Sequence, residues 1–260
     1  MQSEIKMLTD SHAHLFMEDW FPDLRDIAEQ CKEKGVRYVV NSGLEKDTNQ
    51  KVLEISETHK TFLPSIGLYP GEVQKKSEAQ LNSEIAFLNE NISRCSAIGE
   101  MGLDGTYPEL EKQKKWFSRA LSISASHGRP AIIHSRKAEK ELIECIESTL
   151  LENNPAFRKV ILHCFMGSMK LVNKAVEKGW YFTIPAIAGR SEHFKSLIKN
   201  VPLRQLLTET DSPFLAPKKG ETNYPWNTKE AILEIANVKR ITQEETQNLI
   251  YLNFARLFLA

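Results

Sequence analysis

Cysteine is scarce in this sequence, and the few cysteines are not spaced as a framework. Only four occur in 260 residues, and no two of them form a C-x-x-C pair. A disulfide framework needs an even set of cysteines at short, regular spacings. We therefore expect free thiols in a reducing compartment. The cysteines are Cys31, Cys95, Cys145 and Cys164.

Long apolar segments are also missing. No run approaches the roughly 18–20 apolar residues of a membrane-spanning helix. The first six residues carry both charges and no apolar core, so we expect no secretory signal peptide. These features, with the unpaired cysteines, predict a cytoplasmic protein that does not bind membranes. Since repeats, low-complexity tracts and linkers are absent, residues 1–260 are expected to form a single domain.

The chain has no excess of either charge. Lys+Arg and Asp+Glu number 34 each, so the formal net charge is zero. Domains that coat duplex DNA through bulk charge are usually strongly basic, and this composition argues against that class. A local basic patch around an active site remains compatible with a neutral chain. Nothing in the sequence indicates a protein partner.

What the sequence does contain is a regular alternation of short apolar strands and amphipathic helices. Such strands, separated by helices, are typical of buried parallel strands joined by right-handed crossovers. Eight units in about 250 residues predict an α/β fold, the (β/α)8 TIM barrel. An open doubly wound sheet is the alternative, but no glycine-rich loop follows the first strand, where that fold often binds nucleotides. The first predicted strand ends near residue 15. The other seven span 36–41, 62–67, 95–100, 130–134, 159–163, 180–184 and 205–209. The predicted helices span 18–34, 47–59, 77–92, 109–127, a stretch ending near 151, 168–178, 228–238 and 242–258.

A histidine pair marks the first predicted strand. Side chains alternate between the faces of a strand, so Asp10, His12 and His14 share one face. Two neutral imidazoles two residues apart can reach one metal ion. Alone, an H-x-H pattern is a weak signal in a chain with seven histidines.

Acids and histidines recur at the ends of later strands. Glu100, His134 and His163 end the fourth, fifth and sixth predicted strands, and Asp211 follows the eighth. In a barrel, the carboxyl ends of all strands face one mouth, where catalytic groups lie. The sequence therefore predicts one cluster of imidazoles and carboxylates there.

With these motifs in place, the chain resembles the TatD-type metal-dependent nucleases of the amidohydrolase superfamily. The resemblance covers the chain from about Met7 to the C-terminus. It depends on D-x-H-x-H-L at 10–15, G-E-x-G-L-D at 99–104, I-I-H-S-R at 132–136, H-C-F-x-G-S at 163–168 and L-L-T-E-T-D-S-P-F-L-A-P at 206–217.

The resemblance implies a site for two divalent metal ions. His12 and His14 would bind the first ion with Asp211, Glu100 would bridge both ions, and His134 and His163 would bind the second. Strand four offers Glu100 and no lysine for the bridge, which favours the nuclease branch over relatives that use a carboxylated lysine. Imidazoles mixed with carboxylates suit Zn²⁺, Mn²⁺, Co²⁺ or Fe²⁺ better than an all-oxygen Mg²⁺ site. Mg²⁺ stays open, because family members are assayed with it.

The expected activity is hydrolysis of phosphodiester bonds, as a deoxyribonuclease that acts on DNA ends or single strands. Asp211 would accept the proton of the attacking water, with Glu100 holding the ions. A small-molecule amidohydrolase or lactonase could use the same ligands. A metal-bearing scaffold without catalysis is the other alternative.

Five further residues are expected to support the site. Asp10 and Glu209 are predicted to orient imidazoles. Arg136 and Lys219 are candidates to bind or steer a phosphate. Tyr69 stands where the family has a histidine in G-x-H-P, and its hydroxyl could donate to a phosphate oxygen. Tyr69 is also, with Tyr224 and Trp226, a candidate platform for unpaired bases.

Overall fold

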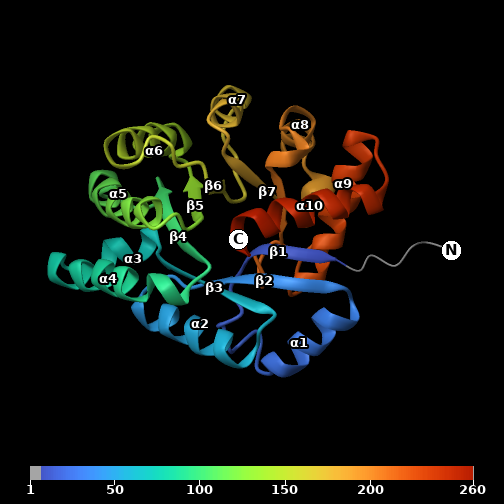
Figure 1. Ribbon diagram of the computed structural model, residues 1–260, viewed down its shortest axis with the longest axis horizontal. Coiled ribbons are helices and arrows are strands. Elements are labelled where there is room, and N and C mark those ends of the chain that lie inside the picture. Colours follow the sequence, from blue (N-terminus) through green and yellow to red (C-terminus); the bar gives the residue numbers. More distant parts are fainter. Residues whose placement is uncertain (1–6, 260) are drawn as a thin grey trace.

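Eight parallel strands form the sheet of the computed structural model, which describes residues 7–259. Each strand pairs in parallel with the next along the chain, in the order β1 to β8, and the helices surround them (Figure 1). The strands are β1 (Leu8–Ala13), β2 (Val36–Ser42), β3 (Phe62–Leu68), β4 (Ala97–Asp104), β5 (Ala131–Arg136), β6 (Val160–Leu162), β7 (Tyr181–Pro185) and β8 (Leu206–Glu209).

Contacts between β1 and β8 bring the first and last strands together. The Thr208 hydroxyl donates to the Thr9 carbonyl oxygen at 2.7 Å. The Asp211 N–H donates to the His12 carbonyl oxygen at 2.9 Å, and Ala13 bridges to Ser212. The predicted (β/α)8 barrel is therefore confirmed, and its closure places Asp211 beside the histidines of β1.

The helices follow the strands. They are α1 (Leu24–Glu33), α2 (Lys46–Thr58), α3 (Pro70–Lys75), α4 (Glu78–Asn91), α5 (Leu110–Ser126), α6 (Glu139–Asn153), α7 (Met169–Glu177), α8 (Glu192–Asn200), α9 (Thr228–Lys239) and α10 (Gln243–Phe258). No helix within residues 7–259 is long and apolar enough to cross a membrane. The prediction about a signal peptide concerns residues 1–6, which lie outside the described residues.

The helices of the structure differ from the sequence prediction in three places. The first helix begins at Leu24 and not at residue 18, because Pro22 disfavours a helical residue before it and Asp23 caps the start. The Asp23 carboxylate accepts hydrogen bonds from the backbone N–H groups of Arg25 and Asp26. Helices α3 and α8 are absent from the sequence prediction, and both are less than three turns long.

Strand β4 runs past its predicted end at Glu100 as far as Asp104. Its pairing with β5 is irregular between Ile98 and Met101 and then resumes, with Gly102 opposite His134. Gly102 has a φ of 154°, and a Cβ there would lie 2.0 Å from the His134 carbonyl oxygen. Glycine is therefore required for β4 and β5 to approach so closely. As a result, Glu100 lies within the strand and Asp104 becomes its last residue.

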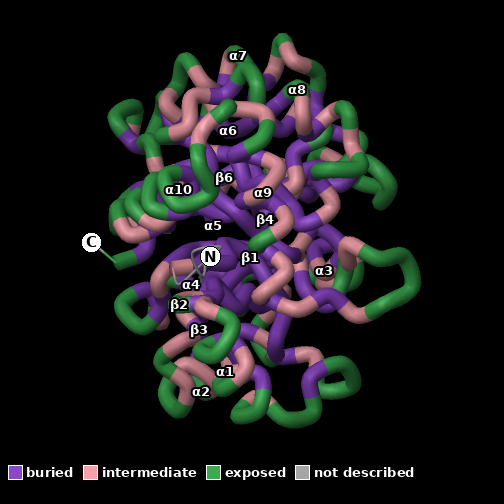
Figure 2. The backbone as a smooth tube through the Cα atoms, turned by 90° about the vertical axis from the view of Figure 1, so that its right-hand side faces the viewer, coloured by how far each residue is buried: buried purple, intermediate pink, exposed green. Residues whose placement is uncertain are grey.

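The end of the barrel opposite the mouth is filled with apolar side chains. Phe254, Leu257 and Phe258 of α10 pack there against one residue from each of five strands. Those residues are Val40, Ala97, Ile132, Ile161 and Leu207. Figure 2 shows the buried strands at the centre of the molecule and the exposed outer faces of the helices. The strands that carry the polar cluster at the mouth are thus held by a packed apolar core at their other end.

Candidate metal centre

Six side chains from five strands or the segments directly after them meet at the mouth of the barrel. They can be grouped into three sets of ligand atoms, each within 4.8 Å of one another: His12, His14 and Glu100; His12, His163 and Asp211; and Glu100, His134 and His163. These are the six residues that the sequence predicts as ligands. All are buried except Asp211 and His134, which are partly exposed.

One half of the cluster contains His12 of β1 and His14, which directly follows this strand. The Nε2 atom of His14 lies 3.4 Å from both Glu100 Oε2 and Asp211 Oδ1. The Nε2 atom of His12 lies 3.7 Å and 3.5 Å from the same two oxygens. Tetrahedral ligands at roughly 2.0–2.1 Å from an ion are about 3.3–3.4 Å apart, so these four atoms are spaced as ligands of one ion.

The other half of the cluster faces the second oxygen of Glu100. Glu100 Oε1 lies 2.8 Å from His134 Nδ1 and 3.2 Å from His163 Nε2. The two oxygens of one carboxylate therefore face two different pairs of imidazoles. A carboxylate placed in this way could bridge two cations.

The hydrogen bonds of the imidazoles leave a lone pair directed into the cluster. His14 Nδ1 donates to the Ser42 carbonyl oxygen at 2.9 Å, and His12 Nδ1 lies 3.1 Å from the Ser42 hydroxyl. The inward Nε2 of His12 is buried and has no hydrogen-bond partner among the described residues. An orphaned buried nitrogen is costly unless a ligand satisfies it, so the donor set fits a metal ion.

Buried carboxylates hold the other two imidazoles. His163 Nδ1 donates to Glu209 Oε2 at 3.2 Å, so Glu209 lies where the sequence places it, against an imidazole. His134 Nε2 donates to Asp104 Oδ2 at 3.2 Å. The sequence predicts no role for Asp104, although this residue ends the G-E-x-G-L-D motif. Burial opposes the charge of Asp104, but hydrogen bonds from His134 and Thr106 lower its pKa to about 2.

Asp10 does not orient an imidazole as predicted. Its Oδ1 accepts hydrogen bonds from the backbone N–H groups of His12 at 3.2 Å and Thr210 at 3.0 Å, and its Oδ2 accepts from the Thr210 hydroxyl. The fully buried carboxylate thus joins β1 to the segment after β8. Its contribution is to the backbone that carries His12 and Asp211.

Burial and neighbouring charges move the pKa values of the cluster. Burial, followed by the charge on His163, holds the pKa of His12 well below its usual value. Burial also opposes charge on His163, but Glu209 and Glu100 outweigh it and raise its pKa well above the usual value. For Glu100, burial is outweighed by hydrogen bonds from His134 and His163, which hold the pKa of the carboxyl well below its usual value.

The two remaining histidines also favour positive charge. Burial works to lower the pKa of His14, but the carboxylates of Asp211 and Glu100 raise it overall. For His134, Asp104 and Glu100 outweigh burial in the same way. The cluster therefore attracts cations, and protons compete with metal ions for three of its four imidazoles.

A cavity of about 340 Å³ opens above the cluster. Its lining includes five of the six proposed ligands, together with Tyr69, Arg136, Met17, Leu44 and Phe214. The Tyr69 ring packs edge-on against His134, with 5.1 Å between centroids. Arg136, the last residue of β5, is exposed at the rim.

Other predicted substrate residues lie away from this cavity. Lys219 is exposed in the loop between β8 and α9 and is not part of the cavity lining. Tyr224 and Trp226 stack on each other, with centroids 4.7 Å apart, and both pack against the apolar core. Of the three aromatic candidates for base stacking, only Tyr69 borders the cavity.

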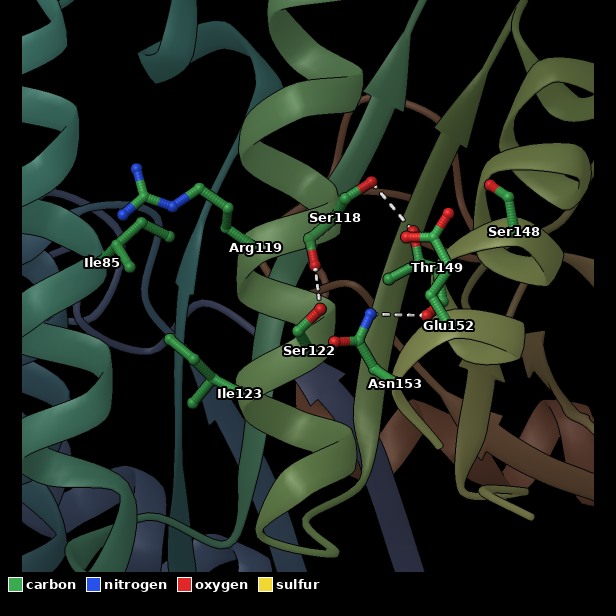
Figure 3. A pocket seen from close by; sticks show the side chains of 9 residues that line it. All are labelled: Ile85, Ser118, Arg119, Ser122, Ile123, Ser148, Thr149, Glu152 and Asn153. Atoms are coloured by element: carbon green, nitrogen blue, oxygen red, sulfur yellow. Dashed lines mark hydrogen bonds between the residues drawn. The ribbon is translucent and has the colours of Figure 1, made fainter. Parts of the chain in front are cut away.

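A second cavity, of about 530 Å³, lies outside the barrel between α5 and α6 (Figure 3). Its polar groups are largely used within the protein. The Thr149 hydroxyl donates to that of Ser118 at 2.9 Å, and the Asn153 amide donates to the Thr149 carbonyl oxygen at 2.7 Å. None of the nine described residues that line it is a histidine. The concentration of metal-binding side chains is at the barrel mouth.

Comparison with known proteins identifies relatives along the whole barrel. The profile of the TatD related DNase family matches residues 9–259. Deoxyribonuclease TATDN3 of Homo sapiens is 31% identical over 264 residues, which cover 96% of this chain and 94% of that protein. The uncharacterized metal-dependent hydrolase YabD of Bacillus subtilis is 30% identical over 260 residues, covering 97% of this chain and 99% of that protein. The crystal structure of YjjV, a TatD homologue from Escherichia coli, has the same fold, with a TM-score of 0.87, 24% identity and coverage of 97% and 98%.

Proposed function

The chain belongs to the TatD related DNase family of metal-dependent hydrolases, and from that premise we propose that it is a two-metal deoxyribonuclease. It is a hydrolase that acts on ester bonds. The observation that carries the finer proposal is the position of Glu100, whose two oxygens face two separate pairs of imidazoles. The name of the human relative, a deoxyribonuclease, supports DNA as the substrate.

Each proposed ligand belongs to one of two ions. His12, His14 and Asp211 would hold the first ion, His134 and His163 the second, and Glu100 would bridge them. The donor set suits Zn²⁺, Mn²⁺, Co²⁺ or Fe²⁺, and Mg²⁺ remains compatible with the carboxylates. Two ions bound there would acidify a water molecule and polarise the phosphoryl group.

Asp211 is positioned to act as the general base. Its side chain is 17% exposed and lines the cavity, so one oxygen can reach a water molecule while the other faces the histidines of β1. The residue adopts a left-handed φ of 58°, a conformation that aspartate tolerates better than most residues. Proton transfer by a positioned carboxylate typically contributes about 10²–10⁴-fold in rate.

Two side chains at the rim are suited to hold the phosphate. Arg136 can donate two parallel hydrogen bonds to phosphate oxygens. Burial, followed by the charge of Glu100, raises the pKa of Tyr69 above its usual value, so its hydroxyl keeps its proton and can donate. Lys219, outside the cavity, would act at longer range by steering the polyanion.

The test is cleavage of end-labelled single-stranded and duplex DNA by protein stripped with EDTA and reloaded with each divalent ion. Wild type should degrade DNA from an end only after metal is restored. Asp211→Asn should lose about 10²–10⁴-fold. Asp47→Asn, an exposed aspartate on α2, is the matched control and should retain full activity.

Failure on DNA would redirect the assignment. A protein that binds two ions but cleaves no DNA would refute the nuclease. Hydrolysis of lactones or cyclic amides that persists in Arg136→Ala would then favour the small-molecule amidohydrolase. If the protein hydrolysed neither DNA nor these small molecules, the non-catalytic metal-bearing scaffold would remain.

The four cysteines are free, which fits our prediction of a cytoplasmic location.

A further inference from the structure

The cavity at the barrel mouth has two chemically different walls. Tyr69 and Arg136 border it on the side of His134, from the ends of β3 and β5. Met17, Leu44 and Phe214 border it from the loops after β1, β2 and β8. We call these three residues the apolar wall. None of their side chains offers a strong hydrogen-bond donor or acceptor.

Phe214 is the exposed member of the apolar wall. Its side chain is 45% exposed, although a phenylalanine gains free energy by leaving water. The Phe214 N–H donates to the Asp211 carbonyl oxygen at 2.8 Å, which ties the residue to the turn that carries the proposed base. Its ring centroid lies 6.3 Å from that of His14. A large apolar face thus lies beside the proposed ligands His14 and Asp211 and is open to solvent.

The size of the cavity limits what can cover that face. About 340 Å³ is at the lower end of the range for small-molecule sites, roughly 300–1,000 Å³. A space of this size suits one residue of a polymer rather than a length of duplex. Within such a residue, the flat face of a nucleobase matches the apolar wall, and the phosphate matches Arg136 and the metal ions.

We propose that the apolar wall is a nucleobase subsite that stacks the base of an unpaired terminal nucleotide on Phe214. This inference rests on the proposed nuclease function and specifies its substrate. Stacking needs a base whose face is not covered by a neighbour, so a duplex end must fray before it can bind. Because the wall makes no directional hydrogen bonds, it accepts all four bases and confers no sequence preference.

The experiment uses the metal-loaded enzyme and single-stranded oligonucleotides that differ in one terminal residue. Two modified substrates are made, one with an abasic tetrahydrofuran residue at the 5′ end and one with it at the 3′ end. Cleavage of the unmodified oligonucleotide in the same assay shows which end the enzyme attacks. Wild type should cleave the first bond from an abasic end about 5- to 150-fold more slowly than from a normal end, the effect of losing one stacked base. Equal rates at the attacked end would overturn the subsite.

Variants of Phe214 locate the effect. Phe214→Ala should slow cleavage of the normal end by the same factor and leave the abasic end at the wild-type rate, whereas Phe214→Tyr should restore the preference. Leu151→Ala, an exposed apolar side chain at the far end of α6, is the matched control. Equal slowing of both substrates by Phe214→Ala would refute a base contact. Absence of any DNA cleavage by metal-loaded wild type would remove the nuclease assignment, and the subsite with it.

Discussion

The substitution Glu209→Gln tests the prediction that Glu209 orients His163 as a metal ligand. Glu209 is fully buried, and its two oxygens face two donors: His163 Nδ1 at 3.2 Å and the Cys164 backbone N–H at 2.9 Å. A carboxylate accepts at both positions, so the His163 proton stays on Nδ1 and the lone pair of Nε2 faces Glu100. A glutamine has only one accepting end.

Either orientation of the new amide opposes a donor with a donor. If the amide nitrogen faces His163, the ring must move its proton to Nε2, the atom that would bind the second ion. If it faces Cys164 instead, the Cys164 N–H keeps the Thr183 hydroxyl oxygen at 3.0 Å as its acceptor, but the buried amide N–H of the glutamine finds no acceptor there, which costs roughly 1–3 kcal/mol of stability. Loss of such an orienting contact typically weakens metal binding about 10- to 100-fold. This corresponds to about 1.4–2.8 kcal/mol at 1.4 kcal/mol for each tenfold change.

The assay is calorimetric titration of metal-free protein with Mn²⁺ or Zn²⁺, resolved into two binding events. One affinity should fall by the stated factor, and the other should stay within about threefold, because Glu209 contacts only one half of the cluster. Glu84→Gln is the matched control. That buried carboxylate lies 3.1 Å from Lys76 Nζ, accepts from the Lys46 N–H at 2.7 Å and, within residues 7–259, contacts none of the six proposed ligands, so its loss should affect stability but neither affinity. Two unchanged affinities in Glu209→Gln would refute the reasoning.

Two further predictions follow from the same cluster. Asp104→Asn should lower the affinity for the second ion about 10- to 100-fold, because Asp104 accepts the hydrogen bond that orients His134. The measurement is calorimetry, with Asp47→Asn as the control. Normal binding of both ions by Asp104→Asn would contradict the prediction. The thermal stabilisation by metal should be larger near pH 8 than near pH 6. Protonation of His14 and His163, whose pKa values are raised in the fold, stabilises the metal-free protein below the ordinary pKa of histidine. This stabilisation is lost as the pH rises through the raised pKa values. At low pH a metal ion must also displace these protons, so it binds more weakly there. Equal melting-temperature gains at both pH values would contradict it.

The cluster of imidazoles and carboxylates could be predicted from sequence because strand ends are visible in it. A short apolar run that stops at a histidine or an acid places that side chain at the mouth once a parallel barrel is assumed. His14 and His163 directly follow β1 and β6, Asp211 comes just after β8, and the structure brings these three together. Glu100 lies within its strand, but irregular pairing of β4 still leaves its side chain among the imidazoles. An error in strand length was therefore harmless there.

The contacts behind the ligands depend on geometry that the sequence does not reveal. Asp104 reaches His134 only because β4 continues beyond Glu100 and keeps close pairing with β5 through Gly102. The sequence predicts Asp10 against an imidazole, yet its partner Thr210 lies 200 residues away and meets it only when the barrel closes. The exposure of Phe214 follows from the turn after β8, which no periodicity indicates.

A chain with no net charge can still bind DNA, because the charge at the site is set by the ions. Four carboxylates contact the imidazoles of the cluster and carry a formal charge of −4 together. They are Glu100, Asp104, Glu209 and Asp211. Two divalent ions would balance them, which leaves Arg136 as the uncompensated charge of the cavity lining. Protons on three of the imidazoles offset part of this negative charge before metal binds, and two ions in their place would add positive charge. A mouth that gains positive charge in this way needs no basic surface elsewhere, in accord with a short, terminal substrate rather than a long duplex.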